Sequence, residues 1–123
     1  MSLIPDNLKY TKDHEWADVE GTLATIGITD HAQRELGDIV FVELPKVGAS
    51  VKAGESFGTI EAVKTVAELY APVSVKVTEV NNDLAADAGV INTDPYGKGW
   101  IVKIEVAGST DELIDAAEYT KLV

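Results

Sequence analysis

The chain of 123 residues contains no cysteine, only two histidines and a single methionine. The lack of cysteine excludes disulfides, thiolate metal sites and a cysteine nucleophile. It also leaves no protein thiol that would exchange with a reactive disulfide cofactor. His14 and His31 lie far apart in the sequence, and no GxSxG, HExxH or phosphate-binding glycine motif is present. The sequence therefore predicts no metal site and no catalytic residues.

Positive charge is also scarce, because 10 Lys and Arg stand against 21 Asp and Glu, for a formal net charge of -11. This balance argues against nucleic acid and against anionic membrane surfaces as partners. It suits attraction towards basic patches on partner proteins. No apolar run is long enough to span a bilayer, and the first residues lack the pattern of a secretory signal. We therefore expect a soluble cytoplasmic protein, or a mitochondrial one with its targeting segment removed if the source is a eukaryote.

The length suits one domain, and short strands separated by turn residues indicate a sandwich or barrel. Strands are expected at residues 8–11, 15–19, 22–28, 38–44, 50–52, 57–63, 65–70, 73–80 and 100–106, and helices at 29–36 and about 110–119. The strand at 38–44 has apolar residues on both faces, which predicts a central position in a sheet. For the last helix, Ser109 and Glu112 have the spacing of a capping box.

Lys64 is placed between the strands expected at 57–63 and 65–70. A tight hairpin there would raise its amine roughly 10 Å from the body of the protein, at about 3.3 Å per residue. Neither glycine nor proline marks the turn, so the flanking strands would have to impose it. Ala62 is small enough to let another protein approach, Val63 favours extended backbone, and Glu61 is suited to hold a basic residue of a partner. A lone lysine at a turn is more often only a solvated charge, so this pattern alone leaves both interpretations open.

A short internal echo flanks this lysine. Ser50-Val51-Lys52 is followed by Glu55, and Ser74-Val75-Lys76 is followed by Glu79 at the same spacing. The echo is compatible with two similar halves related by a pseudo-two-fold axis, and also with chance.

Several motifs, taken in order, resemble the glycine cleavage system H protein family of lipoyl carriers. The resemblance covers nearly the whole chain. Its motifs are YTKDHEW at 10–16, TIGITDHAQ at 25–33, LGDIVFVELP at 36–45, GTIEAVK at 58–64, APVS at 71–74, EVN at 79–81, NTDPYGKGW at 92–100 and EY at 118–119. One departure is Val75, which stands where the family usually has glycine.

The resemblance implies a mainly β fold of the barrel-sandwich hybrid type, with short helices that include one at the C-terminus. It implies a single lipoyl-carrier domain over 1–123, with a lipoyl core at about 20–107 and the terminal helix at about 110–119. Lipoate would be joined to Lys64, and Glu61, Ala62 and Val63 would be recognised around it.

The resemblance also implies a carrier that is not itself an enzyme. It would move the aminomethyl group of glycine from glycine decarboxylase (P protein), which uses pyridoxal phosphate, to the tetrahydrofolate-dependent aminomethyltransferase (T protein). Dihydrolipoyl dehydrogenase (L protein) and lipoylating enzymes would be its further partners.

The loaded arm would end in an amine that is cationic at neutral pH, so an acidic cleft is expected to receive it, and burial there would limit loss of the unit to water. The candidate acids are Glu15 and Glu68. Ile28, Ala32 and Leu36 are the candidates for an apolar wall along the carbon chain. The alternative is that these residues are ordinary surface and core.

Three rival hypotheses remain at this stage. Biotinyl carriers also display a lysine, but they usually place methionine on both sides of it, whereas Val63 and Thr65 flank Lys64. An unmodified homologue acting as an interaction module or lipoyl-relay factor is the second. The third is an enzyme that uses Lys64 as a Schiff-base amine, which would need a desolvated pocket and a neighbouring cation, whereas the local charges are acidic.

Overall fold

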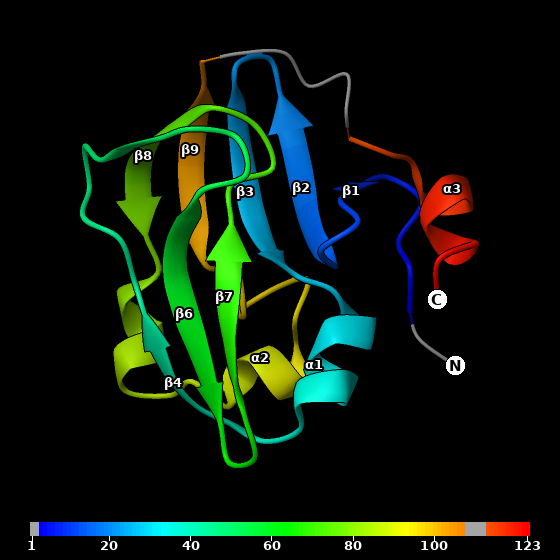
Figure 1. The fold of residues 1–123 in the computed structure, drawn as a ribbon, viewed down its shortest axis with the longest axis vertical. Coiled ribbons are helices and arrows are strands. Elements are labelled where there is room, and N and C mark those ends of the chain that lie inside the picture. Colours follow the sequence, from blue (N-terminus) through cyan, green and yellow to red (C-terminus); the bar gives the residue numbers. More distant parts are fainter. Residues whose placement is uncertain (1–2, 108–112) are drawn as a thin grey trace.

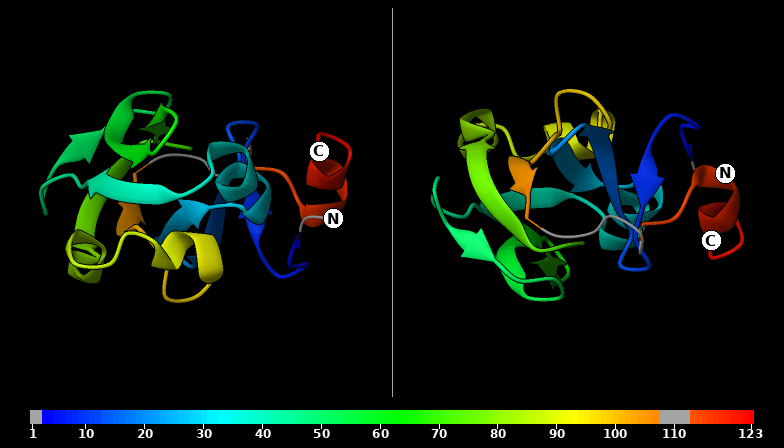
Figure 2. Two further views of the ribbon diagram at one scale, coloured as in Figure 1. Left: turned by 90° about the horizontal axis from the view of Figure 1, so that it is seen from below. Right: turned by 90° about the horizontal axis from the view of Figure 1, so that it is seen from above.

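The structure, a computed structural model, describes residues 3–107 and 113–123. Two antiparallel sheets form its body, as Figures 1 and 2 show. The large sheet has the strand order β1 (Lys9–Tyr10), β2 (Glu15–Glu20), β3 (Leu23–Ile28), β9 (Val102–Val106), β8 (Val75–Val80) and β5 (Ser50–Val51). The small sheet has the order β4 (Ile39–Glu43), β6 (Ser56–Ala62) and β7 (Val66–Tyr70). The predicted mainly β class with short helices is thus confirmed.

The short helices are α1 (Asp30–Leu36), the 3-10 turn η1 (Asn82–Ala85), α2 (Val90–Thr93) and α3 (Ala116–Thr120). Helix α1 begins at Thr29, whose side chain accepts a hydrogen bond from the N–H of Ala32, as an N-cap does. It ends at Gly37, which has a φ of 78° and donates its N–H to the carbonyl of Gln33. The left-handed conformation favours glycine, so this end of the helix agrees with the sequence prediction.

The core lies between the two sheets and is made of alternate residues of their strands. In β8, Val75 and Val77 are buried while Lys76 and Thr78 are exposed, as a strand with one covered face requires. A second, smaller cluster holds the C-terminal segment against the start of the chain. Tyr10 and Tyr119 stack at its centre, with 4.7 Å between their ring centroids.

The predicted central position of strand 38–44 is wrong, because β4 is an edge strand of the small sheet. Its residues are apolar on both faces for another reason. Val42 is buried in the core, whereas Val40 and Phe41 remain exposed on the outside. The register of β4 is irregular between Ile39 and Phe41, which agrees with the exposure of two successive residues.

The C-terminal helix starts at Ala116, later than the predicted start near residue 110. Ile114 instead forms an isolated bridge with Tyr10, through mutual backbone hydrogen bonds of 2.7 and 2.9 Å. Asp115 is the N-cap, since its side chain accepts from the N–H of Glu118. The predicted capping box of Ser109 and Glu112 lies outside the described residues.

The internal echo has a structural counterpart. Strand β5 pairs with β8 so that Ser50 lies opposite Lys76 and Val51 opposite Val75. The two copies of the motif are therefore antiparallel neighbours, related by a local two-fold axis. Val75 is buried in β8 and pairs with Val106, before the irregularity in register between Val77 and Glu79, so the valine at this position fits the sheet. None of the helices in the described ranges is both long and apolar enough to cross a membrane.

Candidate functional site

Lys64 lies at the tip of the β6–β7 hairpin, which extends beyond α1 and α2 at the lower end of the molecule in Figure 1. The side chains of Val63, Lys64 and Thr65 are all exposed. The N–H of Ala62 donates to the carbonyl of Thr65 at 2.8 Å, which closes a turn that contains no glycine or proline. The lysine amine is thus accessible to another protein, as the sequence predicted.

The turn rests on the segment that joins α1 to β4. The N–H of Val63 donates to the carbonyl of Asp38 at 2.9 Å. That segment is in turn held by the half-buried side chain of Asn92 in α2. Its Oδ1 accepts from the N–H of Ile39 at 2.9 Å, and its Nδ2 donates to the carbonyl of Gly37 at 2.8 Å. Asn92 therefore fixes the support of the hairpin tip, which explains how the turn forms without turn residues of its own.

Replacing Asn92 with alanine is expected to destabilise the fold by about 1–3 kcal/mol, because it leaves the N–H of Ile39 and the carbonyl of Gly37 without their side-chain partner. Thermal unfolding followed by circular dichroism measures this as a fall of several degrees in Tm. The matched control is Asn82→Ala, at an exposed asparagine in η1. Equal Tm values for the two variants would contradict the supporting role.

The stem of Lys64 leads back towards α1. A Cβ atom placed on Gly37 would lie 3.4 Å from Cε of Lys64. The next residue towards the N-terminus, Leu36, lines a cavity of about 400 Å³ between α1, the ends of β2 and β3, and the edge strand β7. The lysine side chain therefore lies beside Gly37, the residue that follows Leu36 of the cavity lining.

This cavity, which we call the arm cleft, brings together every residue that the sequence predicted for docking. Its lining includes Glu15, Ile28, Ala32, Leu36 and Glu68. Glu61, Ala62 and Val63 lie outside it, at the end of β6 and in the turn. The cleft thus has an apolar wall and carboxylates near the accessible lysine.

Glu15 is the deepest acid of the arm cleft, since its side chain is only 2% exposed. One carboxyl oxygen, Oε2, accepts from the N–H of Tyr70 in β7 at 2.8 Å. The other, Oε1, is buried without a hydrogen-bond partner among the residues that the structure describes. Burial raises the pKa of this carboxyl to about 8, although the hydrogen bond from Tyr70 opposes that change. Such an unpartnered oxygen is suited to receive a cation.

Glu68 lies nearer the surface of the cleft. It is exposed, and its carboxylate accepts a hydrogen bond from the hydroxyl of Ser56. It can attract a cation to the cleft, whereas Glu15 is better placed to hold one away from water.

Both histidines also line the arm cleft, which the sequence analysis did not predict. The rings of His14 and His31 lie 4.7 Å apart, centroid to centroid. His14 has a positive φ of 65°, unusual for a residue other than glycine. The signal in the sequence was that His14 directly precedes the predicted Glu15. Within residues 3–107 and 113–123, no three His, Asp or Glu side chains are arranged to hold a metal ion.

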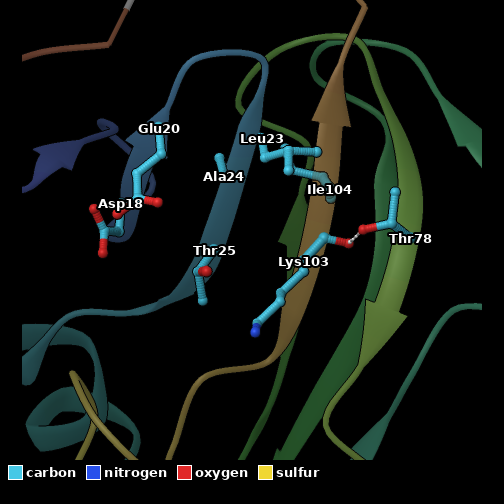
Figure 3. A pocket seen from close by; sticks show the side chains of 8 residues that line it. All are labelled: Asp18, Glu20, Leu23, Ala24, Thr25, Thr78, Lys103 and Ile104. Carbon is cyan, nitrogen blue, oxygen red and sulfur yellow. Dashed lines mark hydrogen bonds between the residues drawn. The ribbon is translucent and has the colours of Figure 1, made fainter.

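A second cavity, of about 360 Å³, lies on the outward face of the large sheet. Figure 3 shows its lining, in which Asp18 and Glu20 lie on β2 and Lys103 lies on β9. The backbone carbonyl of Lys103 accepts a hydrogen bond from the hydroxyl of Thr78. None of its lining residues belongs to the hairpin or to the arm cleft. It therefore provides exposed positions for control substitutions.

Comparisons with known proteins agree with one another on the family and fold. The family model described as Glycine cleavage H-protein matches residues 8–123. The glycine cleavage system H protein of Rubrobacter xylanophilus is 56% identical over 121 residues, covering 98% of this chain and 95% of that protein. The one from Chlorobium limicola is 58% identical over 124 residues, covering 98% and 97%. A crystal structure of the H protein from Mycobacterium marinum superimposes with a TM-score of 0.88 at 44% identity, covering 96% of this chain and 97% of that one.

Proposed function

This chain belongs to the glycine cleavage H-protein family, and we propose that it carries the aminomethyl group of glycine on a lipoyl group joined by an amide to Lys64. Proteins of this family are carrier subunits of the glycine cleavage system and not catalysts. The observation that supports the attachment most directly is the exposed Lys64 at the tip of a braced hairpin. Glu61, Ala62 and Val63 are proposed as the residues that lipoylating enzymes recognise beside it.

The residues around Lys64 fit such a group. When attached, lipoate supplies a dithiolane whose sulfur can carry a one-carbon unit and whose dithiol can be reoxidised. The stretch of β7 from Val66 to Tyr70 spans about 13 Å at about 3.3 Å per residue. A long arm that starts at Lys64 can therefore follow this edge as far as Glu15. Ile28, Ala32 and Leu36 offer it an apolar wall inside the arm cleft.

The arm cleft is proposed to protect the cargo between partners. A cargo amine is cationic at neutral pH, and the unpartnered Oε1 of Glu15 offers it a buried carboxyl that becomes its charged partner when the amine docks. Charge-assisted hydrogen bonds of this kind are stronger than neutral ones. Glu68 at the surface of the cleft adds attraction on the way in. Both acids therefore favour a docked arm once the arm is loaded.

The donor of the cargo is proposed to be glycine decarboxylase (P protein) and its acceptor the aminomethyltransferase (T protein). Dihydrolipoyl dehydrogenase (L protein) would reoxidise the arm. The relatives named above are bacterial, which supports the expectation of a cytoplasmic carrier over a mitochondrial one.

The test is reconstituted glycine cleavage with purified P, T and L proteins. The lipoylated chain is expected to support glycine-dependent release of carbon dioxide and formation of methylenetetrahydrofolate. The unmodified chain is expected to give background rates. A lipoylated chain that remains inactive with partners proven active by another H protein would overturn the proposal.

The outer face of the small sheet is proposed as the surface that meets the aminomethyltransferase. The hairpin patch consists of Val40, Phe41, Val63 and Val66, which are between 46% and 75% exposed. Phe41 lies opposite Glu61, which lies opposite Val66, so one row crosses all three strands. The only cation in these strands and in the hairpin turn is Lys64, whereas four acids, Asp38, Glu43, Glu61 and Glu68, lie in these strands or directly next to them in the chain. Charge complementarity thus calls for an apolar partner surface ringed by Lys and Arg.

The substitution Phe41→Glu is expected to raise the Kd for the aminomethyltransferase about tenfold or more, since a charge replaces a central apolar contact. Titration calorimetry with the unlipoylated chain measures this docking separately from the arm. The matched control is Leu23→Glu, which changes a 53% exposed leucine in the cavity of Figure 3. Equal affinities of the two variants, or binding that does not weaken with salt, would contradict this assignment of the surface.

A further inference from the structure

The C-terminal helix reaches the arm cleft through one side chain. The hydroxyl of Tyr119 in α3 lies 2.8 Å from Nδ1 of His14 and 2.7 Å from Oγ1 of Thr29. Thr29 and Tyr119 are fully buried, and His14 is half-buried in the lining of the cleft. A chain of three polar groups therefore runs from the cap of α1, through α3, to a histidine beside Glu15.

The direction of these hydrogen bonds follows from counting donors. Oγ1 of Thr29 already accepts from the N–H of Ala32, so its own hydrogen still needs an acceptor. Within residues 3–107 and 113–123, the one other hydrogen-bond partner of Thr29 Oγ1 is the hydroxyl of Tyr119. A buried hydroxyl hydrogen without an acceptor costs about 1–3 kcal/mol. Thr29 therefore donates to Tyr119, and Tyr119 donates to Nδ1 of His14.

This order determines which nitrogen of His14 carries the hydrogen. A neutral imidazole has one donor and one acceptor nitrogen. Because Nδ1 accepts from Tyr119, the hydrogen must sit on Nε2. Protonation of Nδ1 would remove the hydrogen bond from Tyr119, so the same contact also opposes a charged ring. The positive φ of His14 and the adjacent His31 ring further restrict where the imidazole can lie.

We propose that Tyr119 is a positioning residue of the arm cleft, which holds His14 as a neutral imidazole with its hydrogen on Nε2. The link to the cargo rests on the proposed function. A charged His14 would repel a cationic amine that enters the cleft. It would also weaken the attraction between that amine and Glu15. A neutral His14 avoids that repulsion. The C-terminal helix thus serves the cleft as well as the small core around Tyr10.

Titratable groups from several surrounding elements face this histidine. They are Asp13 and Glu15 beside it, His31 and Glu35 on α1, Glu68 on β7 and Tyr119 on α3. Burial lowers the pKa of His14, and His31 lowers it further, while Asp13 and Glu35 act in the opposite direction. The neutral form that the hydrogen-bond order requires therefore agrees with the surroundings of the ring.

The test compares Tyr119→Phe with Tyr10→Phe. The two rings stack on each other at 4.7 Å, and each substitution removes one hydroxyl from the same small core. The hydroxyl of Tyr10 donates to the carbonyl of Pro5 at 2.6 Å and not to His14. Any effect of packing alone should therefore appear in both variants, whereas an effect on His14 should appear only in Tyr119→Phe.

Nitrogen NMR of the unlipoylated protein reads the ring of His14 directly. The natural chain and Tyr10→Phe are expected to show the Nε2–H tautomer and a pKa below the ordinary value of about 6.5. Tyr119→Phe is expected to show mixed tautomers and a higher pKa for His14. In lipoylated protein loaded by glycine decarboxylase, only Tyr119→Phe should shorten the lifetime of the cargo, by a few-fold.

A His14 spectrum that is unchanged in Tyr119→Phe would overturn the proposal, as would an Nδ1–H tautomer in the natural chain. A changed spectrum with an unaltered cargo lifetime would also overturn it, because Tyr119 would then orient His14 without serving the cleft. The NMR measurement needs no lipoyl group. Failure of the proposed function would appear separately, as a Lys64 that lipoylating enzymes do not modify.

Discussion

Replacing Lys64 with arginine is expected to abolish glycine cleavage in the reconstituted system, down to the background rate without a carrier. Arginine keeps the positive charge and most of the aliphatic stem, so the hairpin should be retained, with the stem still beside Gly37. Its guanidinium stays protonated at neutral pH and forms no amide with lipoate under these conditions. The variant therefore separates the amine from the charge. Carbon dioxide release from labelled glycine is the measurement.

The matched control is Lys76→Arg, at an exposed lysine that is the second residue of β8. It makes the same chemical change on a strand, away from the hairpin, and is expected to retain full activity. Far-ultraviolet circular dichroism should show both variants folded, because neither side chain belongs to the core. Residual glycine cleavage by Lys64→Arg would show that another residue carries the arm, and the carrier proposal for Lys64 would then fail.

Replacing Glu15 with glutamine is expected to shorten the lifetime of the loaded form by about tenfold to a hundredfold. The neutral amide keeps an oxygen for the N–H of Tyr70 but removes the charge that Oε1 offers to the cargo. A hydrogen bond to a charged group contributes about 1.5–3 kcal/mol, and about 1.4 kcal/mol is a factor of ten. The measurement is the rate of ammonia and formaldehyde release from chain loaded by glycine decarboxylase.

The control for this substitution is Glu20→Gln, at an exposed glutamate in the cavity of Figure 3 on the large sheet. It lowers the net negative charge by the same amount without touching the arm cleft. An unchanged lifetime in Glu15→Gln, or an equal change in Glu20→Gln, would remove Glu15 from the docking site.

The carboxyl of Glu15 is also expected to make the stability of the fold depend on pH. Burial raises its pKa in the folded state from 4.5 to about 8, so between these values the folded state holds a proton that the unfolded state has released. The contribution of Glu15 to the free energy of unfolding should therefore be most favourable below pH 4.5 and should fall as the pH rises towards 8. Glu15→Gln should remove this decline and stabilise the unloaded protein at pH 8 by at most about 4 kcal/mol. Urea unfolding at pH 5.5 and pH 8 measures the difference.

Glu15 is thus expected to lengthen the lifetime of the loaded form and to lower the stability of the empty protein. Such opposite effects are expected of a functional residue. The carboxyl destabilises the empty protein because its charge would be buried without a partner. A docked cation supplies that partner and favours the ionised form, so loading and docking of the arm should release a proton near pH 7. The cost in stability is thus linked to the capacity of the arm cleft to hold an amine.

The sequence predicted those parts of the site that depend on local patterns and on the family motifs. Lys64 is exposed, and Glu15, Ile28, Ala32, Leu36 and Glu68 line one cavity, whereas their role in docking stays a prediction. The end of α1 at Gly37 was also predictable, because the left-handed conformation there favours glycine.

The parts that could not be predicted depend on contacts between distant segments. Asn92 supports the hairpin through Gly37 and Ile39, more than 50 residues away in the chain, and nothing in its neighbours indicates this. Tyr119 reaches His14 across 105 residues. The two histidines looked separate in the sequence, yet α1 turns one ring onto the other. The position of β4 was predicted wrongly because apolar residues on both faces usually indicate a buried strand, whereas here one face is the hairpin patch.

Family membership argues against a biotinyl carrier and against a Schiff-base enzyme, and one measurement decides between a lipoyl carrier and an unmodified homologue. The chain is produced in cells that are supplied with lipoate and contain lipoylating enzymes, and is then analysed by intact mass and by fragmentation of its peptides. A single lipoyl group on Lys64, absent from the Lys64→Arg variant, is the predicted result. A chain that stays unmodified while another lipoyl protein in the same cells is fully modified, or a lipoyl group on another lysine, would contradict the account.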